Sequence, residues 1–557
     1  MSISHLKNSL SQGKFLDVAF GRIPFAGDLC FSSSDATFVY GYNALGEGQW
    51  QEIEAVFWKG KRLAATEWNF HSGALATAMT TGPQIVDSFF PKDVPHSRTA
   101  AVGYRDPIAL ADADTSKKPP LSMEGIAKTK LCADYNQQGV MTGFSYTLNP
   151  ARQIIQILVD YARLPHYPGG YASAAAYALS RIDWGAWFDF RNFHAQTETV
   201  DYRTIADFLG FGLTANYYAG ANFQTFSEKF VHPNFDINYS TQPPATFVST
   251  PLSARFEGYI KFQYAETYTI TVTHDNGTRF YLNGNLLIDQ WQDDGLHPIG
   301  VHSATFNAAP GDFVPIKIDW NDEGGLGQLK VEWSSTSQPN EIVPSKFLYP
   351  KEELRSLYES TIFFSAPTAP LAAIDEILRI CNSVRQEATG KIRFLPLDTL
   401  AASFVFDADN IIEGTFKASP PSVLRTNPIT EYRAKMRNSD SRFVESPVSP
   451  PSHFPDRLAG REIENVAEIE LYSMTQWQAL KVLAMVEKLH GATLTDEWIS
   501  DETKSYPVIE NDLVSITHRK TGGAAKIYRI TNATDAGYNR DGSKPPLRKF
   551  TAARWQR

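Results

Sequence analysis

The stretch from residue 268 to residue 289 constrains the fold more than any other part of this sequence. It reads YTITVTHDNGTRFYLNGNLLID, so three runs of β-forming residues are separated by Asp275-Asn276-Gly277 and by Asn283-Gly284. Asn-Gly pairs accept the positive φ angles of tight hairpin turns, and the runs between them are rich in β-branched and aromatic residues. The stretch therefore predicts antiparallel strands joined by hairpins.

A larger β-rich module surrounds this stretch. Between residues 212 and 350 the sequence alternates apolar and polar residues and shows little helical periodicity. Helical patterning ends before the module and resumes at Pro370. We expect the helices on either side to pack together, so the β module is an insertion within a longer chain.

Three segments carry signals for the ends of helices. Asn149 is an expected N-cap with Pro150 at the first helical position, in a helix that ends before Pro165. An apolar stripe over 371–384 predicts another helix, stopped by Gly390. The Ser473-Met-Thr-Gln run has the form of a capping box and predicts a helix over about 473–489. Shorter helices are expected at 182–193 and 202–209, and short strands within 16–60.

Composition limits the kinds of partner. The 557 residues carry a formal net charge of −9 and contain no basic run. Binding to nucleic acid or to an anionic membrane depends on clustered Lys and Arg. We therefore expect no specific nucleic-acid sequence as a partner.

The cysteines and the N-terminus indicate the compartment. Cys30, Cys132 and Cys381 are far apart and form no CxxC pair, so reduced and buried thiols are expected. The first residues lack the apolar stretch of a secretory signal, and the sequence has no apolar run long enough to span a membrane. We expect a protein that is made in soluble form in a cytoplasm.

The inserted module resembles the PA14 domain family along its whole length. Residues 212–218 (GLTANYY) look like the opening strand of that family, and residues 274–291 (HDNGTRFYLNGNLLIDQW) resemble its "DDGSRLYIDG…W" signature. Further elements follow in the family's order at 256–260, 310–320, 329–333 and 342–349. The resemblance implies a two-layer β sandwich.

PA14 domains occur in glycosidases, adhesins and toxins and often bind carbohydrate. In the lectin-type members an Asp-Asp pair holds a Ca²⁺ that grips sugar hydroxyls. Here the pair is His274-Asp275, so one carboxylate is missing. Two alternatives stay open: Asp275 and Asn276 contact a ligand, with Asp275 holding Ca²⁺, or they only form the turn. The acidic loop Asp293-Asp294-Gly295 is expected to be solvated.

The flanking sequence resembles the central hub proteins of bacteriophage tail tips, which attach a long tail to its host. The similar segments are 21–28 (GRIPFAGD), 123–136, 144–155 (FSYTLNPARQII), 374–394, 427–436 (NPITEYRAKM), 473–479 and 511–517, in the family's order. The resemblance implies two related β barrels per chain and a homotrimer with pseudo-sixfold symmetry. It also implies a structural virion protein at the tail tip, involved in host attachment and DNA passage.

The same resemblance implies partners: neighbouring tail-tip and tail-tube proteins, the tape-measure protein and, through the PA14 insertion, a host cell-surface glycan. The predicted fold class is multidomain and mainly β with α+β parts. We divide the chain into an N-terminal β-rich hub region at 1–145, a helical segment at 146–211, the PA14-like sandwich at 212–350, a second helical segment at 351–392, and a C-terminal β-rich hub region at 393–557.

An enzyme is the alternative class. The sequence has no G-x-S-x-G, HExxH or Walker motif. Asp183, Asp189 and Glu376 are conceivable acid and base groups, but their spacing favours helix caps and exposed faces. We predict no catalysis. The alternative is a carbohydrate-active enzyme with an accessory PA14 domain, which would require a large catalytic barrel of βα units in the flanks.

Overall fold

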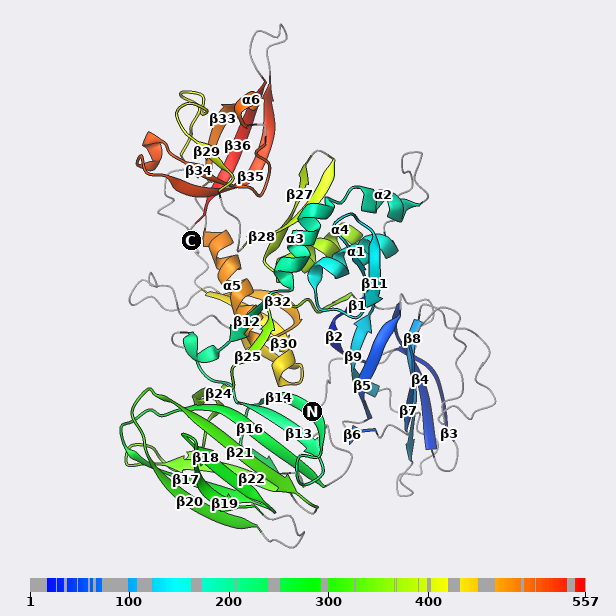
Figure 1. The fold of residues 1–557 in the computed structure, drawn as a ribbon, viewed down its shortest axis with the longest axis vertical. Helices are drawn as coiled ribbons and strands as arrows, with labels where there is room; N and C mark the ends of the chain where they lie inside the picture. The colour runs from blue at the N-terminus through cyan, green and yellow to red at the C-terminus, as the bar shows by residue number, and fades with distance from the viewer. Residues whose placement is uncertain are drawn as a thin grey trace.

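The computed structural model describes most of the chain. The described residues are 18–555 except 27, 35–37, 48, 59–60, 64–66, 73–98, 108–122, 162–172, 206–207, 239–250, 292–298, 325–326, 365, 367, 389, 398–401, 419–430, 449–465, 492–494, 506 and 538–545. The fold is mainly β, with helices concentrated in the middle of the molecule (Figure 1). This confirms the predicted fold class. Among the described residues, no helix is long and apolar enough to cross a membrane.

The inserted module is a sandwich of two antiparallel sheets, drawn in green in the lower part of Figure 1. In its described part, one sheet has the order β14-β13-β16-β21-β18-β19 with β24 beside β16, and the other has the order β15-β22-β17-β20 with β23 beside β22. The strands are Leu213–Ala219 (β13), Thr225–His232 (β14), Asp236–Asn238 (β15), Leu252–Lys261 (β16), Thr267–His274 (β17), Thr278–Leu282 (β18), Asn285–Gln290 (β19), Gly300–Asn307 (β20), Phe313–Asp322 (β21), Gln328–Ser334 (β22), Glu341–Ile342 (β23) and Leu348–Pro350 (β24).

A continuous apolar core lies between these two sheets. Buried and more exposed residues alternate along β16 and β17, because each sheet turns one face toward the other. Trp320 and Trp333 are completely buried in this core, one from each sheet. The alternation that the sequence shows over 212–350 is therefore the pattern of a two-layer sandwich.

The two Asn-Gly turns of the 268–289 stretch have different roles. Asn283 and Gly284 have φ angles of 50° and 79° and join β18 to β19 as a hairpin. The turn at 275–277 is not a hairpin, because β17 pairs with β20 and β22 in one sheet while β18 pairs with β19 and β21 in the other. The prediction that it joins paired strands is wrong: both edges of β17 are already occupied, so the chain crosses between the layers.

The module is joined to the rest of the chain by a two-stranded antiparallel ribbon. Strand β12 (Thr197–Val200) precedes the module, β25 (Glu353–Ser356) follows it, and Val200 lies opposite Glu353. Ion pairs hold the module's β14 against the scaffold: Arg442 contacts Glu228 at 2.8 Å with both side chains mostly buried, and Lys229 pairs with Glu353. Strand pairing and ion pairs therefore fix the position of the module on the rest of the chain.

Helices from both sides of the insertion pack into one cluster. As expected, α1 (Pro150–Tyr161), α2 (Ala174–Ser180) and α3 (Trp184–His194), which precede the insertion, share a core with α4 (Pro370–Ile380), which follows it. Asn149 caps α1 as predicted, since its Oδ1 accepts a hydrogen bond from the N–H of Ala151 at 3.0 Å. The segment also contains β10 (Cys132–Tyr135), β11 (Met141–Ser145), β27 (Ser383–Ala388) and β28 (Lys391–Pro396).

Strands also pair across the insertion at the base of the scaffold. Strand β1 (Val18–Phe20) pairs with β26 (Ile362–Phe364), although the whole PA14-like module lies between them in sequence. Cys132 and Cys381 are buried free thiols, as predicted, whereas the side chain of Cys30 lies outside the described residues. Burial raises the pKa of the Cys132 thiol to about 12.

The N-terminal region contains two sheets that share an apolar core. Their described orders are β2-β9-β5-β6 and β3-β4-β8-β7, so the small sandwich or barrel expected from residues 16–60 is present but draws strands from further along the chain. The strands are Arg22–Phe25 (β2), Asp28–Ser34 (β3), Phe38–Glu47 (β4), Trp50–Trp58 (β5), Lys61–Arg62 (β6), Trp68–His71 (β7), Thr99–Pro107 (β8) and Met123–Lys130 (β9).

The C-terminal region forms a barrel-like sheet of order β29-β34-β35-β36-β33. After β29 the chain turns and bridges back to β33, with Ile411 opposite Ser500 and Lys417 opposite Glu497, which closes the sheet around Trp498 and Phe550. The elements are Phe404–Phe406 (β29), Thr495–Asp501 (β33), Glu502–Ser505 (α6), Leu513–Ile516 (β34), Lys526–Gly537 (β35) and Leu547–Arg554 (β36).

A sheet of order β31-β30-β32 and the helix α5 (Gln476–Gly491) lie between this barrel and the module (Figure 1). Its strands are Glu431–Asn438 (β30), Val444–Val448 (β31) and Val466–Met474 (β32). The predicted capping box is therefore displaced. Ser473 belongs to β32, and Thr475 caps α5 through a 3.1 Å bond from the N–H of Gln478.

Two other helix predictions need correction. The helix expected over 371–384 ends at Ile380, because Asn382 adopts a φ of 49° and the chain turns into β27. Gly390 is the turn of the β27–β28 hairpin and does not stop a helix. In the described part of 202–209 the structure has a short 3-10 turn at Tyr202–Thr204 in place of an α-helix.

Candidate functional site

The turn at 275–277 lies at one end of the sandwich, where the chain crosses between the two sheets. His274, Asp275 and Asn276 are 4%, 9% and 6% exposed, so the turn is buried. Asn276 has a φ of 58°, in the left-handed region that Asn tolerates better than most residues. Both sheets therefore meet at a tightly packed polar turn.

Main-chain groups of this turn bind residues from both layers. The N–H of Asp275 donates to the carbonyl of Gln328 at 2.8 Å, and the Trp320 indole donates to the carbonyl of Asp275 at 3.1 Å. His274 Nδ1 lies 2.8 Å from the carbonyl of Asn276, to which it must donate. These hydrogen bonds fix the backbone of the turn, so some of its polar groups have a structural role.

The end of β21 supplies a second polar group beside the turn. Asn321 Oδ1 accepts the N–H of Gly277 at 2.5 Å, and Asn276 Oδ1 accepts the N–H of Glu323 at 3.3 Å. Asp322 is 1% exposed, and its Oδ1 accepts the N–H of Gly324 at 2.9 Å. The 275–277 turn and residues 321–323 thus form one unit, which we name the crossover site.

Two carboxylate oxygens in the crossover site have no hydrogen-bond partner among the described residues. These are Asp322 Oδ2 and Glu323 Oε1. Burial raises the pKa of Asp322, and the nearby charge of Asp275 raises it further. A buried carboxylate beside a second carboxylate is unfavourable unless a cation or a hydrogen-bond donor compensates it.

The donor chemistry of this site suits a hard cation. Carboxylate and amide oxygens are the ligands that Ca²⁺ takes, and Asp275 and Asp322 provide a pair of carboxylates although the sequence signature has lost one. Among the described residues, no group of three or more His, Cys, Asp or Glu side chains is arranged to hold a metal. The assignment of Ca²⁺ to Asp275 stays a prediction. Asp293, Asp294 and Gly295 lie outside the described residues.

Sequence reasoning missed the contribution of residues 321–323. Asn321 and Asp322 end the strand FVPIKIDWND and Glu323 follows it, so a polar run with two adjacent acids begins directly after a buried tryptophan. That run signals a site only once it is known that β21 ends beside the 275–277 turn. Pairing of Thr278 with Trp320 is the contact that brings the two together.

Aromatic and cationic side chains form a rim at the same end of the sandwich. Phe223 and Trp291 stack with ring centres 5.4 Å apart, and the guanidinium groups of Arg255 and Arg279 lie over these two rings at 4.6 and 5.2 Å respectively. Tyr218 links this group to Phe226, since its ring centre lies 5.4 Å from that of Phe223 and 5.9 Å from that of Phe226, which is 57% exposed. Ser253 ties the rim to the crossover site, since it accepts the N–H of Phe223 and lies opposite Asn321.

The carboxylates considered for catalysis have structural roles. Asp183 caps α3 and binds Arg393 at 2.7 Å, and although its burial opposes ionisation these hydrogen bonds lower its pKa. Glu376 pairs with Arg379 on the same helix, and Asp189 is exposed on α3. The absence of catalysis stays a prediction.

Comparison with known proteins places the module in a family. Residues 211–346 match the PA14 domain family. The anti-sigma-I factor RsgI3 of Acetivibrio thermocellus is 31% identical over 150 residues, which cover 27% of this chain and 23% of that protein. The chain therefore matches less than a quarter of that relative's length, and the resemblance concerns one part of each protein.

Two solved structures similar to this chain differ in how much of it they cover. A PA14 sugar-binding domain from an RTX adhesin is 18% identical, covers 26% of this chain and 99% of its own, and has a TM-score of 0.22. A chain from the virion of a native gene transfer agent particle is 12% identical, covers 99% of this chain and 87% of its own, and has a TM-score of 0.45. Residues 211–346 of this chain are a PA14 domain, set within a longer β-rich protein.

Proposed function

We propose that this chain is a structural virion protein, a trimeric hub at the distal end of a phage tail, whose PA14 domain binds a host cell-surface glycan. The observation that carries the proposal is the order of hub-like sequence segments on both sides of the PA14 domain. Segments before and after the insertion contact each other in one scaffold, with Ile182 bridged to Ile392 and β1 paired with β26. A scaffold built from both flanks is what a hub with an inserted receptor-binding domain requires.

The crossover site is the proposed glycan site. In this proposal Asp275 and Asp322 hold Ca²⁺, which supplies coordination for two sugar hydroxyls. The exposed ring of Phe226 stacks on the apolar face of the sugar, since aromatic rings offer large rigid contact surfaces. Arg255 and Arg279 hold the neighbouring rim in place through their stacking on Phe223 and Trp291.

The oligomeric state tests the hub role. The purified full chain, of 62.1 kDa, is expected to elute as a trimer in size-exclusion chromatography with multi-angle light scattering. Negative-stain images are expected to show ring-shaped particles with three peripheral lobes. A stable monomer across the accessible concentration range would contradict the hub proposal without bearing on glycan binding.

A glycan array probed with the full chain tests the PA14 role. We expect binding to a restricted set of glycans in the presence of Ca²⁺ and its loss on chelation. Asp322→Asn should remove this binding. Asp312→Asn should not, because Asp312 is an exposed residue just before β21, at the opposite end of that strand from the crossover site. Binding that survives chelation and Asp322→Asn would show that the crossover site is only structural.

The carbohydrate-active enzyme remains the competing class, and it has a direct test. The full chain should release no aryl group from a panel of aryl glycosides. Robust turnover by a preparation whose activity follows the protein peak through purification would overturn the virion proposal.

A further inference from the structure

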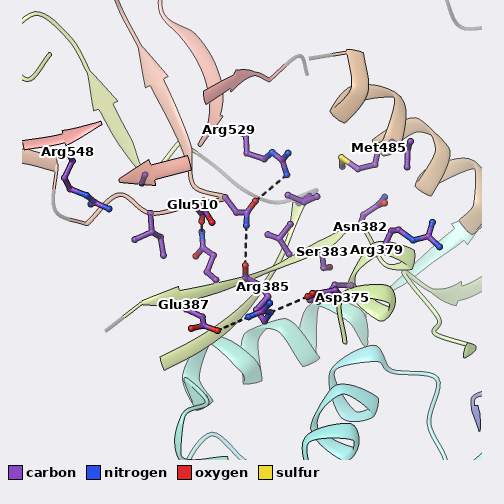
Figure 2. Close-up of a pocket in the computed structure, with 18 residues that line it drawn as sticks. Asp375, Arg379, Asn382, Ser383, Arg385, Glu387, Met485, Glu510, Arg529 and Arg548 are labelled. Carbon is purple, nitrogen blue, oxygen red and sulfur yellow. Dashed lines mark hydrogen bonds and ion pairs between the residues drawn. The ribbon is translucent and has the colours of Figure 1, made fainter. Parts of the chain in front are cut away.

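A cavity of about 740 Å³ lies between the helical scaffold and the C-terminal barrel. Its walls come from α4 and the β27–β28 hairpin on one side, from α5 on another, and from β35, β36 and the loop before β34 on the third (Figure 2). Polar bonds hold these walls together: the Gln386 amide donates to the carbonyl of Glu510 at 2.9 Å and to Asp512 at 3.0 Å. The volume is in the range of cavities that hold small organic ligands.

Two of the arginines that line this cavity are paired with carboxylates. Arg385 pairs with Asp375 at 3.4 Å and with Glu387 at 2.8 Å, as the dashed lines in Figure 2 show. Arg379 pairs with Glu376 on the same helix. These arginines need no further anion.

Arg529 on β35 is different. Its Nη1 donates a 3.4 Å hydrogen bond to Asn511 Oδ1, and its Nε is buried without a hydrogen-bond partner in the described part of the chain. No carboxylate among the described residues pairs with it, and burial lowers the pKa of its guanidinium. An unpaired charge in a partly buried position is costly, so natural proteins seldom keep one without a use.

Apolar side chains complete the lining around this charge. Leu378, Met485, Val486 and Ile509 face the same space. A guanidinium presents parallel N–H donors that match the two oxygens of a carboxylate, and apolar walls favour a ligand with an apolar body. A strongly hydrated inorganic anion would not use those walls.

We propose that this cavity binds a carboxylate carried on an apolar body, with Arg529 as its charged anchor. The carboxylate occupies the space in front of Arg529, and the apolar part lies against α4 and α5. The proposal is independent of the glycan site, which is in another domain. The shared chemistry has two sources, a free small carboxylic acid or an acidic side chain on a partner peptide, and the test separates them.

The first test uses phenylacetate as a probe on the full chain, with saturation-transfer NMR and calorimetric titration. Phenylacetate should bind, while the neutral phenylacetamide and inorganic phosphate should bind at least tenfold more weakly. Arg529→Met should weaken phenylacetate binding at least tenfold and Arg529→Lys less than that. Arg519→Met, an exposed arginine outside the cavity, should leave it unchanged. Equal binding of acid and amide, or binding that Arg529→Met leaves intact, overturns the proposal, as does a preference for phosphate.

The second test identifies the source of the carboxylate. The capped peptide Leu-Glu-Leu is compared with Leu-Gln-Leu against the same variants. Tighter binding of the Glu peptide than of phenylacetate assigns the site to a partner chain, and the reverse assigns it to a small acid. No binding of either probe to the wild-type chain overturns the proposal.

Thermal unfolding adds a readout that does not depend on ligand. If Arg529 is retained for binding, Arg529→Met removes an uncompensated charge, so the melting temperature of the free protein should stay the same or rise. A clear fall of the melting temperature would mean that Arg529 stabilises the fold itself, which contradicts its assignment as an anchor for a ligand.

Discussion

Two turns in the PA14 domain share an Asn-Gly pair with a left-handed Asn and differ in burial and in strand pairing. Asn283-Gly284 is an exposed hairpin turn between β18 and β19. A Cβ atom at Gly284 would have no other atom within 4 Å. Asp275-Asn276-Gly277 is buried, crosses between sheets and binds residues 321–323. The difference shows that a turn motif fixes only the backbone angles, whereas the pairing of its flanking strands decides whether it is a connection or part of a site.

Asn276→Ala should have the largest effect on this comparison. The substitution removes the acceptor of the Glu323 N–H and places a Cβ-bearing residue without a local hydrogen bond at a φ of 58°. We expect a loss of about 2–3 kcal/mol in the free energy of unfolding of the domain. Hydrogen exchange of peptides over 267–290 in the full chain measures it. Asn276→Gly, which relieves the backbone angle but not the lost bond, should lose less.

Asn283→Ala should cost only about 1 kcal/mol, because the residue is exposed and only the left-handed backbone angle is affected. Asn283→Gly should be close to neutral. Exchange in peptides over 278–290 gives the value. If Asn283→Ala and Asn276→Ala cost the same, burial of the 275–277 turn adds nothing, and the distinction between the two turns fails.

Asp322→Asn tests whether the buried turn, unlike the hairpin turn, is part of a Ca²⁺ site. Because burial and Asp275 raise the pKa of Asp322, folding of the metal-free protein disfavours its charged form relative to the unfolded chain. The variant should melt about 2 °C higher than wild type without Ca²⁺, because it removes a buried charge that no cation compensates. Added Ca²⁺ should raise the melting temperature of the wild type and leave the variant unchanged. Equal responses to Ca²⁺ would exclude Asp322 as a ligand.

The smallest expected effect is a pH dependence confined to the crossover turn. Burial lowers the pKa of His274, His302 lowers it further, and the Asn276 carbonyl and Asp275 oppose both. The folded form therefore keeps His274 neutral, so its stability is fully present above the unfolded pKa of about 6.5 and is lost as pH falls below it.

Exchange measurements at pH 7.5 and 5.5, corrected for the intrinsic rates, check this prediction. Protection of residues 267–278 should fall at the lower pH, while the hairpin at 283–284 should be unaffected. His274→Asn keeps a donor for the Asn276 carbonyl and should remove the pH effect. A pH effect of the same size in that variant would assign the titration to another group.

Local signals in the sequence were reliable where the backbone alone decides the structure. Asn149-Pro150 predicts the start of α1, and the alternation over 212–350 predicts a sandwich, because capping and burial on one face are properties of neighbouring residues. The capping box at Ser473 failed because β32 continues to Met474 through pairing with β30, so the cap moved to Thr475. That pairing is a contact with a distant strand.

Only some residues of the candidate site could be predicted from the sequence. Asp275 and Asn276 stand out because they fall in a family signature, but the signature does not indicate where Asp322 lies. Thr278 and Trp320 are neighbours only after β18 and β21 have paired, so the second carboxylate becomes part of the site through tertiary structure. The cavity at Arg529 had no sequence signal, since its walls come from three separate regions.

The ribbon that carries the PA14 domain has a mechanical consequence. Val200 and Glu353 are paired at the end nearest the domain, so a pull on the domain loads both strands in the same direction. The hydrogen bonds between the two strands are perpendicular to this force, so the force does not break them in sequence from one end. Tension reaches the scaffold through both strands at once, at Leu357, whose N–H donates to the Gln196 carbonyl at 2.7 Å, and at the start of β12 after α3. If a particle were held by this domain, the two strands would share the pulling force.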